Sequence, residues 1–150
     1  MSQCDSETLQ KYFETYGWVY RFDGKDILYS GWRSNNRSFS LKVTLSESLI
    51  FFEVKLLVLS SLIRKKHRST ILEYILDLNG GLTIARLSLD EENTVILSSE
   101  SFTDHFTYDH LSKTLGIIGY FSEKLQKEIL AKVADLCLHR EDFYKPFHPQ

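Results

Sequence analysis

The sequence predicts an α+β domain built on an antiparallel sheet of about five to six strands. Two observations support this prediction. Short segments with a two-residue hydrophobic period follow one another through hairpin-type turns, which is typical of antiparallel strands. Segments with a helical period stand at the start, in the middle and at the end of the chain, so strands are grouped between helices.

The first helix is expected to begin at Ser6, a residue that can cap it, and to end at Gly17. One face of this helix is apolar, with Leu9, Tyr12, Phe13 and Tyr16. Three strands should follow at Val19 to Phe22, Asp26 to Arg33 and Arg37 to Leu45. Turn residues at 23–24 and 35–36 separate them.

The next strand, Leu49 to Val58, has two faces of different character. Its even-numbered residues are all apolar: Ile50, Phe52, Val54, Leu56 and Val58. Its odd-numbered residues are mixed: Phe51, Glu53, Lys55 and Leu57. Because successive side chains alternate across a strand, we expect the even face in the core and the mixed face partly exposed.

A second helix is predicted over Ser69 to Asn79, with the stop signal at 80–81. A hairpin should follow, with strands at Ile84 to Leu89 and Thr94 to Ser99 joined by an acidic turn. Thr107 can cap a long last helix whose apolar face continues to Leu136.

Two glycines, Gly116 and Gly119, interrupt the long helix. Each glycine costs up to about 1 kcal/mol relative to alanine in a helix interior. They therefore predict either close backbone packing or a break near Ser122. Both prolines follow Leu138, so an irregular tail is expected at 139–150, after a core of about residues 6–136.

Length and composition indicate one domain over residues 1–150 in a soluble, cytoplasmic protein. The formal net charge of −2 argues against nucleic acid and acidic membranes as partners. The sequence starts without a basic segment followed by an apolar one, so no signal peptide is expected. Its most apolar run is shorter than a membrane span and contains charges, so no membrane association is expected.

The search for catalytic chemistry gives two weak candidates. Asp104, His105, Asp109 and His110 could bind a metal ion in a hydrolase, although their spacing matches no defined ligand set. Cys137 lies close to His139, but no base or oxyanion site is indicated beside the thiol. No paired carboxylates, nucleophile elbow or phosphate loop are present. We therefore expect no enzyme activity and no cofactor.

The basic run 64–68, "RKKHR", offers a different kind of site. Its permanent cations are Arg64, Lys65, Lys66 and Arg68. They could bind a phosphate group or a nucleic-acid backbone, which would make the protein a nucleic-acid or phospholigand-binding regulator. The simpler alternative is a solvated loop. Positive charge just before a helix is mildly unfavourable, which keeps the anion-binding hypothesis open.

A longer pattern resembles a known family. A helix closes on "LN", the strands and turn "IARLSLDEENTVIL" follow, and a long apolar-faced helix comes after a loop. This pattern resembles the YbjN-like family, and the matching residues are Leu78, Asn79, Arg86, Leu89, Asp90 and Val95. The resemblance covers about residues 6–136, and its specific residues lie in the second half. The double glycine after Asn79 and the aromatic first half depart from the pattern.

The resemblance implies the fold shared by YbjN proteins and type III secretion chaperones. That fold is a twisted antiparallel sheet with helices packed on one face. It also implies a homodimer with a chaperone-like or regulatory role, and no catalytic residues. We therefore expect a protein client to bind the mixed face, Phe51, Glu53, Lys55 and Leu57, or the sheet edge. The alternative is that Trp32, a loop or the tail covers Phe51 and Leu57.

Overall fold

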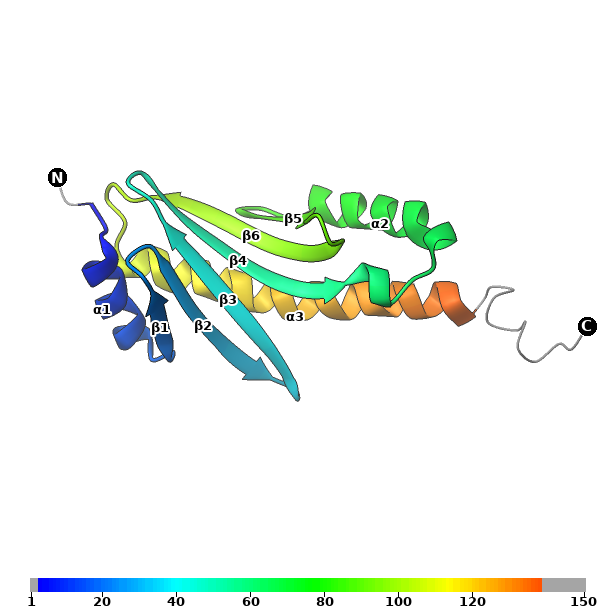
Figure 1. The fold of residues 1–150 in the computed structure, drawn as a ribbon, viewed down its shortest axis with the longest axis horizontal. Coiled ribbons are helices and arrows are strands. Elements are labelled where there is room, and N and C mark those ends of the chain that lie inside the picture. Colours follow the sequence, from blue (N-terminus) through cyan, green and yellow to red (C-terminus); the bar gives the residue numbers. More distant parts are fainter. Residues whose placement is uncertain (1–2, 139–150) are drawn as a thin grey trace, which may run out of the picture.

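The computed structural model describes residues 3–138, and Figure 1 labels its elements. One antiparallel sheet has the strand order β1-β2-β3-β4-β6-β5. Its strands are β1 Tyr20–Asp23, β2 Ile27–Ser34, β3 Arg37–Leu45, β4 Leu49–Val58, β5 Ala85–Leu89 and β6 Thr94–Phe102. The helices of this region are α1 Ser6–Tyr16, α2 Arg68–Gly80 and α3 Tyr108–Leu138. The predicted fold class is confirmed, and the predicted tail at 139–150 lies outside the described residues.

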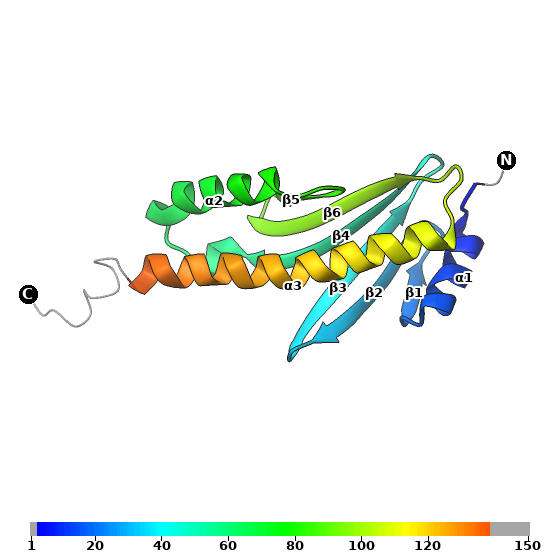
Figure 2. The same ribbon diagram turned by 180° about the vertical axis from the view of Figure 1, so that it is seen from behind.

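The sheet has one covered face and one open face. In Figure 1 the strands lie in front of α3, and the view from behind in Figure 2 shows α3 running along the sheet. Helices α1 and α2 lie near the two ends of this arrangement, beside β1 and β5 respectively (Figures 1 and 2). The prediction of helices mainly on one face is therefore confirmed.

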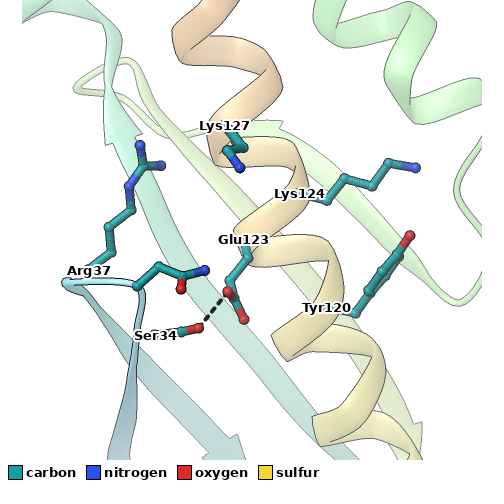
Figure 3. A pocket seen from close by; sticks show the side chains of 7 residues that line it. Ser34, Arg37, Tyr120, Glu123, Lys124 and Lys127 are labelled. Carbon is teal, nitrogen blue, oxygen red and sulfur yellow. Dashed lines mark hydrogen bonds between the residues drawn. The ribbon is translucent and has the colours of Figure 1, made fainter.

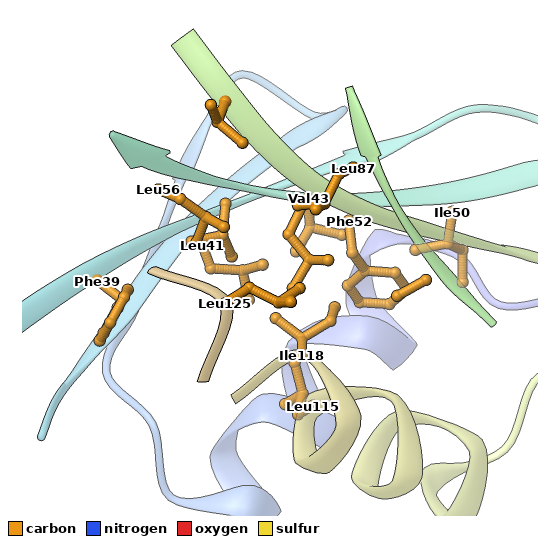
Figure 4. Packing of buried hydrophobic residues seen from close by; sticks show 14 of the residues in the cluster. Phe39, Leu41, Val43, Ile50, Phe52, Leu56, Leu87, Leu115, Ile118 and Leu125 are labelled. Carbon is orange, nitrogen blue, oxygen red and sulfur yellow. The ribbon is translucent and has the colours of Figure 1, made fainter. Parts of the chain in front are cut away.

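The core fills the space between the sheet and α3 (Figure 4). The covered face supplies the predicted alternate residues of β3 and β4, and α3 supplies its apolar stripe. Fully or almost fully buried members are Phe39, Leu41, Val43, Ile50, Phe52, Val54, Leu56, Leu115, Ile118, Leu125 and Ile129. Burial of this many large apolar side chains is the main source of stability for a domain of this size.

A β-bulge in β4 changes the predicted pattern at the end of that strand. The pairing of β4 with β6 shifts between Lys55 and Leu57, so Leu57 pairs with Val95, a fully buried core residue. Val58, expected in the core, is instead 42% exposed. An extra residue in one strand exchanges the faces of all residues that follow it, which explains both changes.

Gln126 of α3 holds the bulge. Its side-chain amide donates to the carbonyl oxygen of Leu56 at 2.7 Å, at the residue that the bulge leaves outside the strand pairing. Its Oε1 accepts from the Arg37 guanidinium at 2.9 Å. One side chain thus joins α3 to the β2–β3 hairpin and to the end of β4.

Two helix predictions need correction. Asp5, and not Ser6, caps α1, because its Oδ1 accepts from the Thr8 N–H at 2.9 Å. Helix α3 is continuous through Gly116 and Gly119, so there is no break near Ser122. A methyl group added at either glycine would meet nothing within 4 Å. Close packing therefore does not explain these glycines either.

Candidate functional site

The face of the sheet opposite α3 is open and takes no part in the core cluster between the sheet and α3 (Figures 1 and 2). Phe51, Glu53 and Lys55 of β4 lie on this face, as predicted from their alternation with the buried residues. Arg86 of β5 stands over the Phe51 ring, 5.9 Å from its centroid, and its Nη1 lies 3.4 Å from Glu100 Oε1. The Arg86 guanidinium therefore contacts both the Phe51 ring and the Glu100 carboxylate.

Leu57 does not belong to this face. It packs against the core cluster, because the bulge turns it to the covered side. The structure therefore brings together three residues of the predicted binding face and separates the fourth. A two-residue period gave no sign of the bulge, because the residues at 54, 56, 57 and 58 are all apolar.

Phe102 is a member of the open face that the sequence analysis missed. It pairs with Leu49, next to the pair of Phe51 and Glu100, and it is 72% exposed. The predicted strand ended at Ser99, whereas β6 continues to Phe102. The alternation of Ser98, Glu100 and Phe102 was the available signal. We use "open-face patch" for Leu49, Phe51, Glu53, Lys55, Arg86, Glu100 and Phe102.

Trp32 does not cover the open-face patch. It pairs with the buried Phe39 on the other side of the sheet. Its ring stacks between Trp18 and Phe39, with centroids 5.1 and 5.0 Å away. The prediction that Trp32 could cover Phe51 is thus wrong. The tail, another of the three segments considered, lies outside the described residues.

The two edges of the sheet differ. At β5, the side-chain amide of Asn79 donates to the Leu87 carbonyl at 2.9 Å, and its Oδ1 accepts from the Leu87 N–H at 2.7 Å. Asn79 thus occupies backbone groups that another strand would need. At the other edge, the short β1 pairs only with residues 27–30 of β2 and leaves residues 31–34 beyond its reach.

The basic residues 64–68 lie where the chain passes from β4 to α2. Arg64, Lys65 and Arg68 line a hollow of about 390 Å³ together with Leu59, Ser60, Ile63 and Asn93. The Arg68 guanidinium donates to Asn93 Oδ1 at 2.6 Å, which connects the basic run to the β5–β6 turn. Lys66 is exposed and is not among the lining residues.

A second hollow, of about 520 Å³, lies between the β2–β3 hairpin and α3 (Figure 3). Arg37, Lys124 and Lys127 are among its lining residues, together with the exposed Tyr120. Its centre holds Glu123, whose Oε1 accepts from the Ser34 hydroxyl at 2.6 Å. This carboxylate opposes anion binding, and the contact serves to fix the hairpin on α3.

Two of the four proposed metal ligands, Asp109 and His110, have structural roles at the start of α3. His110 Nδ1 accepts from the Thr107 N–H at 3.0 Å and the His110 N–H donates to Thr107 Oγ1 at 3.3 Å, which is a capping box at the start of α3. Asp109 forms an ion pair with Lys113 at 2.9 Å. Within residues 3–138, no group of three or more His, Cys, Asp or Glu side chains is placed to bind a metal ion.

The thiol candidate lies at the end of the described part of the chain. Cys137 lies in the last turn of α3, where side chains are not described, and His139 lies outside the described residues. Cys4, by contrast, is buried, and this burial, with Asp5 nearby, raises the pKa of its thiol to about 11. A thiol that remains protonated is a poor nucleophile.

Comparison with known proteins supports the fold. No family model matches the chain, and no curated protein sequence matches it. Among solved structures, YbjN from E. coli is similar with a TM-score of 0.60 and 16% identity, over 89% of this chain and 96% of that chain. SpcU, in the ExoU–SpcU complex of the Pseudomonas aeruginosa type III secretion system, is similar with a TM-score of 0.55 and 13% identity, over 81% and 93%.

The Yersinia pestis type III secretion chaperone SycH, solved with a fragment of YscM2, is also similar. Its TM-score is 0.51 at 14% identity, over 80% of this chain and 98% of that chain. The chain therefore has the fold of YbjN and the type III secretion chaperones. None of the described helices is long and apolar enough to cross a membrane.

Proposed function

We propose that the protein is a non-enzymatic, cytoplasmic protein-binding module that recognises a client through the open-face patch. The observation that supports this most strongly is the division of the sheet into a covered and an open face. The helices bury one face, while the other presents Phe51 and the 72%-exposed Phe102 among paired charges. Exposed aromatic residues beside charged ones are typical of protein interfaces.

The structural neighbours support a protein partner. SycH and SpcU are described in complexes with other proteins, and both share this fold. At 13–14% identity the likeness concerns the fold, so the binding role rests on the surface of this chain. That surface suits an extended segment with alternating apolar and charged side chains, which would meet Phe51 and Phe102 as well as Lys55 and Glu100.

Strand addition is the second way in which a client could bind, and the two edges are not equivalent. Asn79 already occupies the backbone of Leu87 at the β5 edge. The free part of β2, residues 31–34, is therefore the proposed edge for an added strand.

Self-association into a homodimer is part of the proposal. Leu76 on α2 and Ile84 just before β5 are each 68% exposed, and neither belongs to the open-face patch. Sedimentation velocity would detect a dimer directly. A monomer at all concentrations would leave the client-binding proposal intact and remove the homodimer from it.

A pull-down from native cell extract tests client binding. The variant Phe51→Asp places a charge on the open-face patch, and Tyr120→Asp is its control, because Tyr120 is an exposed aromatic residue on α3. Circular dichroism would establish that both variants fold. A partner that wild type and Tyr120→Asp retain but Phe51→Asp loses would support the proposal. Equal capture by all three proteins would contradict it.

A further inference from the structure

The hollow between β4 and α2 brings several cations together. Arg64, Lys65 and Arg68 all line it. The short 3-10 turn Lys65–His67 leads directly into α2, so positions 64, 65 and 68 point to one side while Lys66 does not contribute. The course of the backbone through this turn therefore places the three cations on the same hollow.

Arg68 is fixed in this arrangement. Its guanidinium donates to Asn93 Oδ1 at 2.6 Å, and Asn93 is held in the β5–β6 turn, where its N–H donates to the Asp90 carbonyl at 3.1 Å. An arginine held by one donor pair keeps its remaining N–H groups in a defined direction. Such a pre-ordered guanidinium loses less entropy when it binds an anion.

The charged residues that line the hollow are cations. Among the described residues, three cations and no carboxylate line it. The first turn of α2 also has no acidic residue. The lining is therefore complementary in charge to an anion.

We propose that this hollow binds the phosphate group of a small phosphorylated molecule. Guanidinium groups match phosphate oxygens in geometry, and Ser60 adds a hydroxyl donor. Leu59 and Ile63 provide apolar wall for the rest of the ligand. The volume of about 390 Å³ is in the range of small-molecule sites. A concave site on a chain of net charge −2 fits a compact anion better than a nucleic-acid backbone.

Isothermal titration calorimetry of the full chain would test this site. The probes are inorganic phosphate, ribose 5-phosphate, ribose and a single-stranded oligonucleotide. Lys65→Gln and Arg64→Gln each remove one lining cation, and Lys66→Gln is the matched control, because it removes the same charge from the same run outside the hollow. Circular dichroism would verify that the three variants fold.

Wild type is expected to bind ribose 5-phosphate but not ribose, and Lys65→Gln and Arg64→Gln should each weaken binding about tenfold. Lys66→Gln should change the affinity less than about twofold. Equal binding of inorganic phosphate and ribose 5-phosphate would support a site for free phosphate. The proposal would be overturned by equal losses in all three variants, by no binding of either phosphate, or by salt-sensitive binding of the oligonucleotide alone. None of these outcomes affects the open-face patch.

Discussion

A single extra residue in β4 decides which side chains of this strand meet the core. Up to Lys55 the strand alternates regularly between the covered and open faces. The bulge then turns Leu57 inward and Val58 outward, and Gln126 satisfies the carbonyl of Leu56. At the scale of one residue, the bulge thus removes Leu57 from the open face, and a hydrogen bond from a distant helix satisfies the carbonyl at the bulge.

This arrangement predicts effects of different size for two neighbouring substitutions. Leu57→Asp should lower the free energy of unfolding by about 2–4 kcal/mol, because it places a charge against the core. Val58→Asp should change it by less than about 1 kcal/mol, since Val58 is already 42% exposed. Urea denaturation measures both. Equal effects, or a larger loss for Val58→Asp, would contradict the assigned faces.

Cys4 should be chemically silent in the folded protein. It is only 4% exposed, and burial raises the pKa of its thiol to about 11. At pH 8, three pH units below that pKa, about one thiol in a thousand is the reactive thiolate. Mass spectrometry after iodoacetamide treatment should find Cys4 unmodified in native protein and modified in urea. Rapid modification without urea would show that the thiol is accessible.

At the scale of elements, the Leu78–Asn79 pair that resembles the YbjN-like family has a structural role. Asn79 lies in the last turn of α2 and pairs with both backbone groups of Leu87, as a neighbouring strand would. The β5 edge is therefore closed by a side chain. This explains why asparagine, which has both a donor and an acceptor, is suited to the position.

Asn79→Ala should lower the free energy of unfolding by about 1–3 kcal/mol, because it leaves two partly buried backbone groups unpaired. It should also increase light scattering, since an open strand edge promotes association. Asp77→Ala, an exposed substitution on the same helix, is the control for helix propensity. A variant as stable and as soluble as this control would contradict the closing role.

The glycines of the chain give a second test at this scale. Gly116→Ala and Gly119→Ala should each raise the free energy of unfolding by about 0.5–1 kcal/mol, because both lie within α3 and face open space. Gly31→Ala should lower it, since the added Cβ would lie 2.5 Å from the Phe39 carbonyl oxygen. Thermal unfolding of the three variants checks both signs, and destabilisation at Gly116 would show a contact that α3 makes elsewhere.

For the whole molecule, periodicity was enough to predict the fold class, the helices and the inner face of β3 and β4. These features depend on local alternation and on caps such as Thr107. The bulge, the pairing of Asn79 with Leu87 and the gathering of Phe51, Arg86 and Phe102 depend on strands far apart in the chain. A local pattern contains no information about such pairing, so the residues of the open face could be predicted only in part.

The same long-range pairing gives the molecule its two distinct surfaces. The open-face patch combines residues of β4, β5 and β6, and the basic hollow combines the β4–α2 connection with the β5–β6 turn. The hollow and the open-face patch share no residue. Asn93 of the hollow lies in the β5–β6 turn, whereas Phe51 of the patch lies in β4. A protein client and a small anion are therefore expected to bind independently.

Site-specific photo-crosslinking in living cells tests the central claim most directly. A benzophenone amino acid would replace Phe102 in one protein and Tyr120 in another; both are exposed aromatic positions, at 72% and 59%. Binding at the open-face patch predicts a discrete, light-dependent adduct from position 102 and none from position 120. An adduct only from position 120, or equal adducts from both positions, would contradict the assignment of the open face as the client-binding surface.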